Sequence, residues 1–181
     1  MRRAFLALAG LALLAGCATN TITGRSQLML VSEETAIKGS YGAYAQMMGG
    51  PGKKKQIEAD TDRVKRVREI TDRLIAQAVR FRPDSASWNW EVQVINDPKT
   101  VNAFCMAGGK MAIYSGMWEK LKATDEEIAH VMGHEIAHAL ADHTRERLTS
   151  AMTSGVATTA AAVAITVAGG DDRAGLALSG A

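Results

Sequence analysis

The segment that most constrains this chain is His134-Glu135-Ile136-Ala137-His138, in which two histidines lie four residues apart. Residues four apart fall on one face of an α-helix, about one turn apart, so both imidazoles can reach one point in space. Thr124-Asp125-Glu126-Glu127 fits a capping box and predicts that the helix begins there. Apolar residues follow at helical spacing, namely Ile128, Val131, Met132, Ile136 and Leu140. We therefore expect a core-packed helix that carries both histidines on one side.

This H-E-x-x-H pattern on a helix indicates a zinc site of the metallopeptidase type. His134 and His138 are the candidate zinc ligands. Glu135 follows the first histidine directly and can project beside the metal, where it would take a proton from a water molecule. A zinc peptidase site needs three protein ligands and a water. The motif supplies two of them, so a third ligand must come from elsewhere.

Other histidines of the same region are poor third ligands. His130 and His138 would lie about 12 Å apart along one helix, too far for nitrogens that surround a tetrahedral ion about 3.4 Å from each other. We expect His130 to be packed or to support a ligand. If the helix runs on to Arg145 and Arg147, which suit its dipole, His143 lies about 140° around it from His138 and points elsewhere. Asp142 either orients the His138 ring or is a surface acid.

The sequence after Glu146 offers little more for a metal. It contains no further Glu, His or Cys, and its acidic residues are Asp171 and Asp172. One of these could be a ligand in a loop, or both belong to a solvated turn. Residues 148–170 carry no charge and are rich in Ala, Thr and Gly. A membrane-spanning helix is one interpretation of that segment, and a buried or membrane-facing helix beside the site is the one we favour.

The N-terminal residues are typical of a targeting signal. Arg2 and Arg3 precede an apolar run over residues 4–14, which is too short for a permanent membrane helix. The run ends in Leu14-Ala15-Gly16-Cys17, which resembles a bacterial lipobox, although an ordinary secretory signal would also fit. We therefore predict a lipoprotein signal peptide over 1–16, a lipidated Cys17 with a tether over 17–31, and a folded domain over 32–181. Ala18 after the cysteine favours the periplasmic face of an outer membrane, held by several acyl chains.

The charge balance and the cysteines argue against two other classes of protein, nucleic-acid-binding proteins and cysteine hydrolases. Without residues 1–16 the 21 Lys and Arg residues fall to 19, which equals the 19 Asp and Glu residues. The one basic run, Lys53-Lys54-Lys55, follows a Gly-rich break and reads as a solvated loop, so no nucleic-acid partner is expected. Cys105 lies in an apolar stretch and is expected to be buried, with a role as hydrolase nucleophile the weaker alternative.

The remaining pattern predicts a mixture of helices and strands. Helices are expected over about 32–48 and over 57–80, the latter with Val64, Val67, Thr71, Leu74 and Ala78 on one face. Alternation from Trp88 to Val94 predicts a half-buried strand. Strands over 102–106 and 110–114 surround Gly108-Gly109 and predict a hairpin.

Several of these segments occur in an order that resembles a known family. The lipobox, Thr23-Gly24-Arg25-Ser26-Gln27-Leu28, Asn102-Ala103-Phe104, Gly108-Gly109 and the H-E-x-x-H motif together resemble the bacterial lipoprotein branch of the HtpX and CAAX-prenyl-protease-like zinc metallopeptidases. The likeness covers residues 14–147. It implies a zincin-like α+β domain in which Asn102, Ala103 and Phe104 form the edge strand that lines the cleft and binds a substrate peptide by strand addition.

The same resemblance implies the rest of the site and its surroundings. The family's third zinc ligand is a Glu in a Glu-x-x-Ala-Asp sequence on a later helix, so we expect it beyond Ala181, in a longer protein. Substrates would be unfolded or misassembled envelope proteins, and outer-membrane assembly machinery would be a partner. The alternative is a lipid-anchored, chaperone-like or assembly-factor module without catalysis, because two histidines hold zinc only weakly.

Overall fold

A computed structural model gives the structure of the protein. It describes residues 17–20, 22–49, 57–59 and 61–153. The predictions for the leader over 1–16, for the basic loop over 53–55 and for Asp171 and Asp172 lie outside these residues, as does most of the segment 148–170.

The described elements follow one another as a mixture of helices and short strands, which confirms the α+β class. In chain order they are β1 (Cys17–Thr19), β2 (Ser26–Leu28), α2 (Glu33–Gly49), α3 (Asp62–Phe81), the 3₁₀ helix η2 (Pro83–Ser87), β3 (Glu91–Ile95), β4 (Ala103–Cys105), β5 (Lys110–Tyr114), α4 (Gly116–Glu119), α5 (Asp125–Leu140) and α6 (His143–Thr153). No helix within the described residues is long and apolar enough to cross a bilayer.

The central sheet of the described residues has the strand order β3-β5-β4. β4 and β5 form the antiparallel hairpin that the sequence predicts, and β3 pairs with β5 in parallel. β4 is therefore an edge strand of this sheet, as expected. A second, two-stranded sheet pairs β1 with β2, with Cys17 opposite Leu28.

The hairpin tip depends on its two glycines. Gly108 and Gly109 both have positive φ, +82° and +84°, which side chains rarely adopt. A Cβ on Gly109 would also lie only 2.6 Å from the Trp90 ring. The Tyr41 hydroxyl of α2 donates to the Gly108 carbonyl at 3.2 Å. The tip is thus packed tightly between α2 and the residues before β3.

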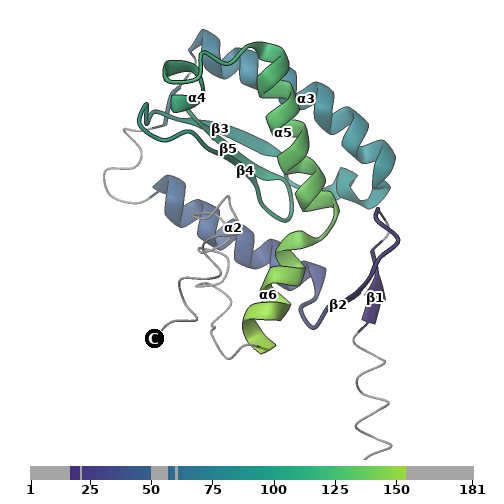
Figure 1. The fold of residues 1–181 in the computed structure, drawn as a ribbon. Coiled ribbons are helices and arrows are strands. Elements are labelled where there is room, and N and C mark those ends of the chain that lie inside the picture. Colours follow the sequence, from purple (N-terminus) through teal and green to yellow (C-terminus); the bar gives the residue numbers. More distant parts are fainter. Residues whose placement is uncertain (1–16, 21, 50–56, 60, 154–181) are drawn as a thin grey trace, which may run out of the picture.

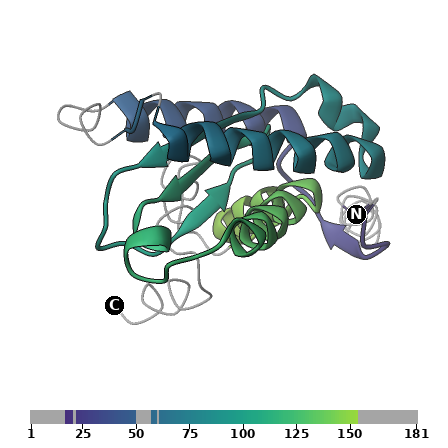
Figure 2. The same ribbon diagram turned by 90° about the horizontal axis from the view of Figure 1, so that it is seen from above.

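Helices cover both faces of the sheet (Figures 1 and 2). On one face, α3 and α5 pack against alternate strand side chains such as Val94, Cys105 and Ile113 in the main core. On the other face, Tyr44 of α2 packs with the intervening residues, among them Phe104. α5 also contacts β4 directly. The motif helix therefore lies beside the edge strand.

The periodicity of α3 is confirmed, while its limits and those of β3 differ from the prediction. Val64, Val67, Thr71 and Ala78 are buried on one face of α3. The helix begins at Asp62, where Thr61 accepts a hydrogen bond from the Val64 amide, and Ile57 instead makes a β-bridge to Ile95.

The strand predicted from Trp88 to Val94 begins later than expected, because Trp88 and Trp90 precede β3 and each packs locally. Trp88 lies on the Arg82 guanidinium, and the Trp90 indole donates to the Ser85 carbonyl at 2.8 Å.

The segment 17–31 contacts the end of the motif helix. Asn20 is buried, and its side-chain amide donates to the Ala141 carbonyl just after α5. Gln27 of β2 donates to Glu146 of α6 at 2.9 Å. The segment 17–31, predicted as a tether, thus contains the strand Ser26–Leu28, which lies against α6.

Candidate functional site

The motif residues sit on a rigid helix whose start is capped as predicted. The Thr124 hydroxyl accepts from the Glu127 amide at 3.3 Å, and the Glu127 carboxylate accepts from the Thr124 amide at 2.8 Å. Ile128, Met132 and Ile136 are buried in the main core on the inner face of α5. Locking one face into the core fixes the direction in which the other face presents its side chains.

Both motif histidines point at one place. The Nε2 atoms of His134 and His138 lie 2.9 Å apart, with the ring planes at 78° to each other. Ligand nitrogens around a tetrahedral zinc ion lie about 3.4 Å apart, so a small opening of this pair would admit the ion. The pair therefore fits two corners of a metal site. Within the described residues no group of three or more His, Cys, Asp or Glu side chains could hold a metal.

Glu135 of α5 is half-buried. Burial raises the pKa of its carboxyl, and electrostatic interactions with His134 and Arg147 oppose this without cancelling it. The Glu135 charge in turn adds to burial in raising the pKa of the Cys105 thiol on β4. A carboxylate with a raised pKa is a better proton acceptor near neutral pH, which suits a general base.

Cys105 is a free cysteine and is buried, as predicted. Because burial holds its pKa far above the usual thiol range, it stays protonated near neutral pH and is a poor nucleophile. This geometry argues against the cysteine-hydrolase alternative.

His143 contacts His138, and our prediction that it points elsewhere is wrong. Its Nδ1 lies 2.6 Å from Nδ1 of His138. The prediction assumed one continuous helix, whereas α5 ends at Leu140 and α6 begins at His143. Between them Asp142 adopts a left-handed conformation, with φ +57°. This bend between α5 and α6 can be followed in Figure 1. It returns His143 to His138 on the motif face.

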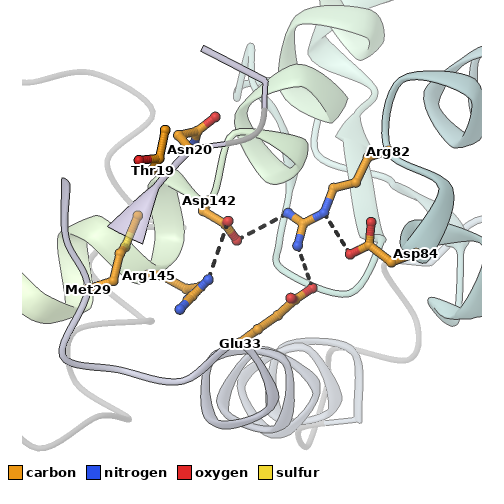
Figure 3. A pocket seen from close by; sticks show the side chains of 8 residues that line it. All are labelled: Thr19, Asn20, Met29, Glu33, Arg82, Asp84, Asp142 and Arg145. Carbon is orange, nitrogen blue, oxygen red and sulfur yellow. Dashed lines mark hydrogen bonds and ion pairs between the residues drawn. The ribbon is translucent and has the colours of Figure 1, made fainter. Parts of the chain in front are cut away.

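A cluster of charges around Arg82 lies behind this bend (Figure 3). Arg82 is 6% exposed and pairs with Glu33 at 2.8 Å, Asp84 at 3.0 Å and Asp142 at 3.2 Å. It also donates to the Leu140 carbonyl at 3.0 Å. Burial disfavours the guanidinium charge, but the carboxylates outweigh it and the pKa of Arg82 is raised. A cavity of about 330 Å³ opens among these side chains, Arg145 and residues of the N-terminal segment.

The remaining sequence candidates fall into three groups. His130 is exposed, which contradicts the expectation that it is packed. Ala103 and Phe104 are buried in the edge strand, and Asn102 lies directly before it, where its side chain accepts from the Ala103 amide at 2.9 Å. Cys17 begins β1, at the N-terminal end of the described residues. Sequence reasoning missed the contribution of Asn20 and Arg82, because nothing near either residue in the chain indicates a contact with α5.

Comparison with known proteins decides the family. The model of peptidase family M48 matches residues 61–180, more than half of the 181 residues. The chain belongs to peptidase family M48. The resemblance predicted from the ordered motifs is thereby confirmed at the level of the family.

Relatives of this M48 chain carry metallopeptidase names. It is 46% identical over 61 residues to mitochondrial metalloendopeptidase OMA1 of Arabidopsis thaliana, which covers 34% of the chain and 12% of that relative. It is 43% identical over 63 residues to the protein of the same name from Saccharomyces cerevisiae, covering 34% of the chain and 18% of the relative. It is 32% identical over 90 residues to metalloprotease LoiP of Escherichia coli, covering 50% of the chain and 34% of the relative.

The matched regions thus span at most about a third of each of these relatives. No solved structure matches the chain.

Proposed function

We propose that this protein is a zinc-dependent endopeptidase whose ion is held by His134 and His138. The observation that supports it best is the 2.9 Å approach of the two Nε2 atoms beside a half-buried Glu135. A bound zinc ion would supply a Lewis acid for the scissile carbonyl and for water. By the family resemblance, a Glu in a Glu-x-x-Ala-Asp sequence on a later helix would supply the third ligand.

The chain's own residues perform the other steps of the proposed reaction. The backbone of the edge strand at Asn102, Ala103 and Phe104 pairs with an extended substrate and holds the scissile bond beside α5. Glu135 accepts a proton from the attacking water and then delivers it to the departing amine. The apolar surroundings of Glu135 favour its neutral form between these two transfers.

The change Glu135→Gln tests this mechanism in the protein expressed from its complete reading frame. It keeps the shape of the side chain and removes the base, so peptide hydrolysis should fall by about 10²- to 10⁴-fold. Zinc content, measured by atomic emission, should stay at the wild-type level. Glu126→Gln makes the same chemical change on the exposed side of α5 and serves as the control. Normal cleavage by Glu135→Gln would refute the role of this residue.

Reading the gene past the codon for Ala181 tests the proposed third ligand. A continuing frame with Glu-x-x-Ala-Asp within several tens of residues would supply the ligand and support the peptidase. A stop codon at that point would favour the alternative, a lipid-anchored binding or chaperone-like module. The two converging histidines of the described residues would then hold zinc weakly, and dialysis would remove it.

We further propose that lipid on Cys17 anchors the protein to the periplasmic face of an outer membrane, where it acts on unfolded or misassembled envelope proteins. The lipobox Leu14-Ala15-Gly16-Cys17 supports the anchor. Cys17→Ala should move the protein from the membrane to the soluble fraction and abolish the mass of the acyl chains. An unchanged membrane fraction would reject this anchor.

A further inference from the structure

We propose that His143 is a positioning residue that fixes the tautomer and orientation of His138, and that the Arg82 cluster holds it in place. This inference rests on the proposed function, because it concerns how His138 is prepared to bind a metal.

The contact between the two rings requires a defined proton. Two ring nitrogens 2.6 Å apart share one hydrogen bond, so one Nδ1 donates and the other accepts. His138 can offer a lone pair at Nε2 to a metal only if its proton is on Nδ1. In that state His143 accepts at Nδ1 and carries its own proton on Nε2. Metal-binding histidines usually donate their second ring N–H to an acceptor, and here the acceptor is another imidazole.

The same arrangement accounts for the contact between His134 and His138. With its proton on Nδ1, His138 accepts at Nε2, so His134 donates from its own Nε2 across the 2.9 Å gap. The three rings then form one directed chain from His134 through His138 to His143. In this direction His138 already presents a lone pair at Nε2, whereas His134 has to move its proton from Nε2 to Nδ1 when a metal binds; in the opposite direction the same would hold for His138.

The backbone bend makes this contact possible, and three consecutive residues of the bend are held by side chains from far along the chain. Arg82 donates to the Leu140 carbonyl at 3.0 Å, and Asn20 donates to the Ala141 carbonyl. Asp142 pairs with Arg82 at 3.2 Å and with Arg145 at 3.4 Å. A left-handed aspartate is uncommon, so it persists only where the surroundings determine it. The cluster supplies those surroundings and so sets the position of the next residue, His143.

Nitrogen-15 spectroscopy of the histidine rings in the metal-free protein is the direct test. We expect the Nδ1–H tautomer for His138 and the Nε2–H tautomer for His143. The exposed His130 reports an unrestrained ring in the same spectrum. An Nε2–H tautomer for His138 would overturn the proposal even if every variant failed to fold.

Zinc affinity provides the second test. His143→Leu removes the acceptor and should weaken zinc binding by about 10- to 100-fold, whereas His143→Asn retains an acceptor oxygen and should recover part of the loss. His130→Leu, the same change on the exposed part of α5, should leave affinity unchanged. Equal affinity of wild type and His143→Leu would reject the positioning role. Absence of zinc binding by the wild type itself would instead refute the proposed function.

Discussion

The two ends of α5 are held in different ways. At its start, Thr124 and Glu127 bond to each other's backbone across three residues. At its end, the Leu140 carbonyl accepts from Arg82, 58 residues away, and the Ala141 carbonyl accepts from Asn20, 121 residues away. The start of the helix is therefore determined locally, and its end depends on the folded whole.

The difference matters because the ends serve different purposes. The first end only has to begin a helix, and a capping box does so in any setting. The second end has to stop the helix where His143 can turn back to His138, which requires an uncommon backbone conformation at Asp142. Such a conformation needs contacts from several elements.

The largest loss of stability is expected for the substitution Arg82→Met. The change removes the buried Arg82 cation from the carboxylates of Glu33, Asp84 and Asp142, whose side chains are 33%, 61% and 15% exposed. Because solvent reaches two of these carboxylates, we expect the free energy of unfolding to fall by about 2–3 kcal/mol, less than for a fully buried pair. Urea denaturation followed by circular dichroism measures it. Arg80→Met, two residues earlier on the exposed side of α3, is the matched control. A loss no larger than that of the control would mean that the end of α5 is not held from a distance.

A smaller effect is expected for Thr124→Ala. The substitution removes the side-chain acceptor of the capping box while the rest of α5 stays packed, so stability should fall by about 1 kcal/mol. The same urea titration measures it, and Thr124→Ser, which keeps the hydroxyl, should remain near wild type. The tautomers of His138 and His143 should be unaffected, since the change lies at the far end of the helix. A shift in those tautomers would show that the two ends are coupled.

The smallest change in stability is expected for the substitution Arg66→Gln. Arg66 of α3 bonds to Asp125 at the start of α5, 2.6 Å between Nε and the carboxylate, and both side chains are exposed. Exposed pairs contribute little, because water and salt screen them. The urea midpoint should not change measurably, at low or at high salt. A clear loss would indicate that the start of α5 also relies on a distant residue.

Predictions from the sequence succeeded where neighbours in the chain decide the structure. The capping box at Thr124, the apolar face of α3 and the two-glycine hairpin are patterns within a few residues, and all three are confirmed. The family was also predicted from ordered motifs and is confirmed. The roles of His134, Glu135 and His138 remain predictions, supported by the geometry of their side chains.

Predictions failed where distant residues decide. Helical periodicity continues smoothly through Asp142, so the bend and the return of His143 are invisible without Arg82 and Asn20 in place. The alternation from Trp88 to Val94 extended the strand too far, because the two tryptophans bind Arg82 and Ser85 instead. The parallel pairing of β3 with β5 joins residues such as Glu91 and Lys110, which lie far apart in the chain, and no local pattern predicts it.

Asn20 would give the molecule a mechanical property if Cys17 carries the lipid proposed above. It follows Cys17 by three residues and its side chain bonds to the backbone at Ala141, the residue directly after the motif helix. A pull on such an anchor would act on β1 and on the contacts that join this segment to the rest of the protein, among them the Asn20 bond to Ala141 and the Gln27 bond to Glu146 of α6. These contacts lie at the bend and in the first turn of α6, where His143 meets His138. Anchor and ring alignment would then depend on the same small set of hydrogen bonds.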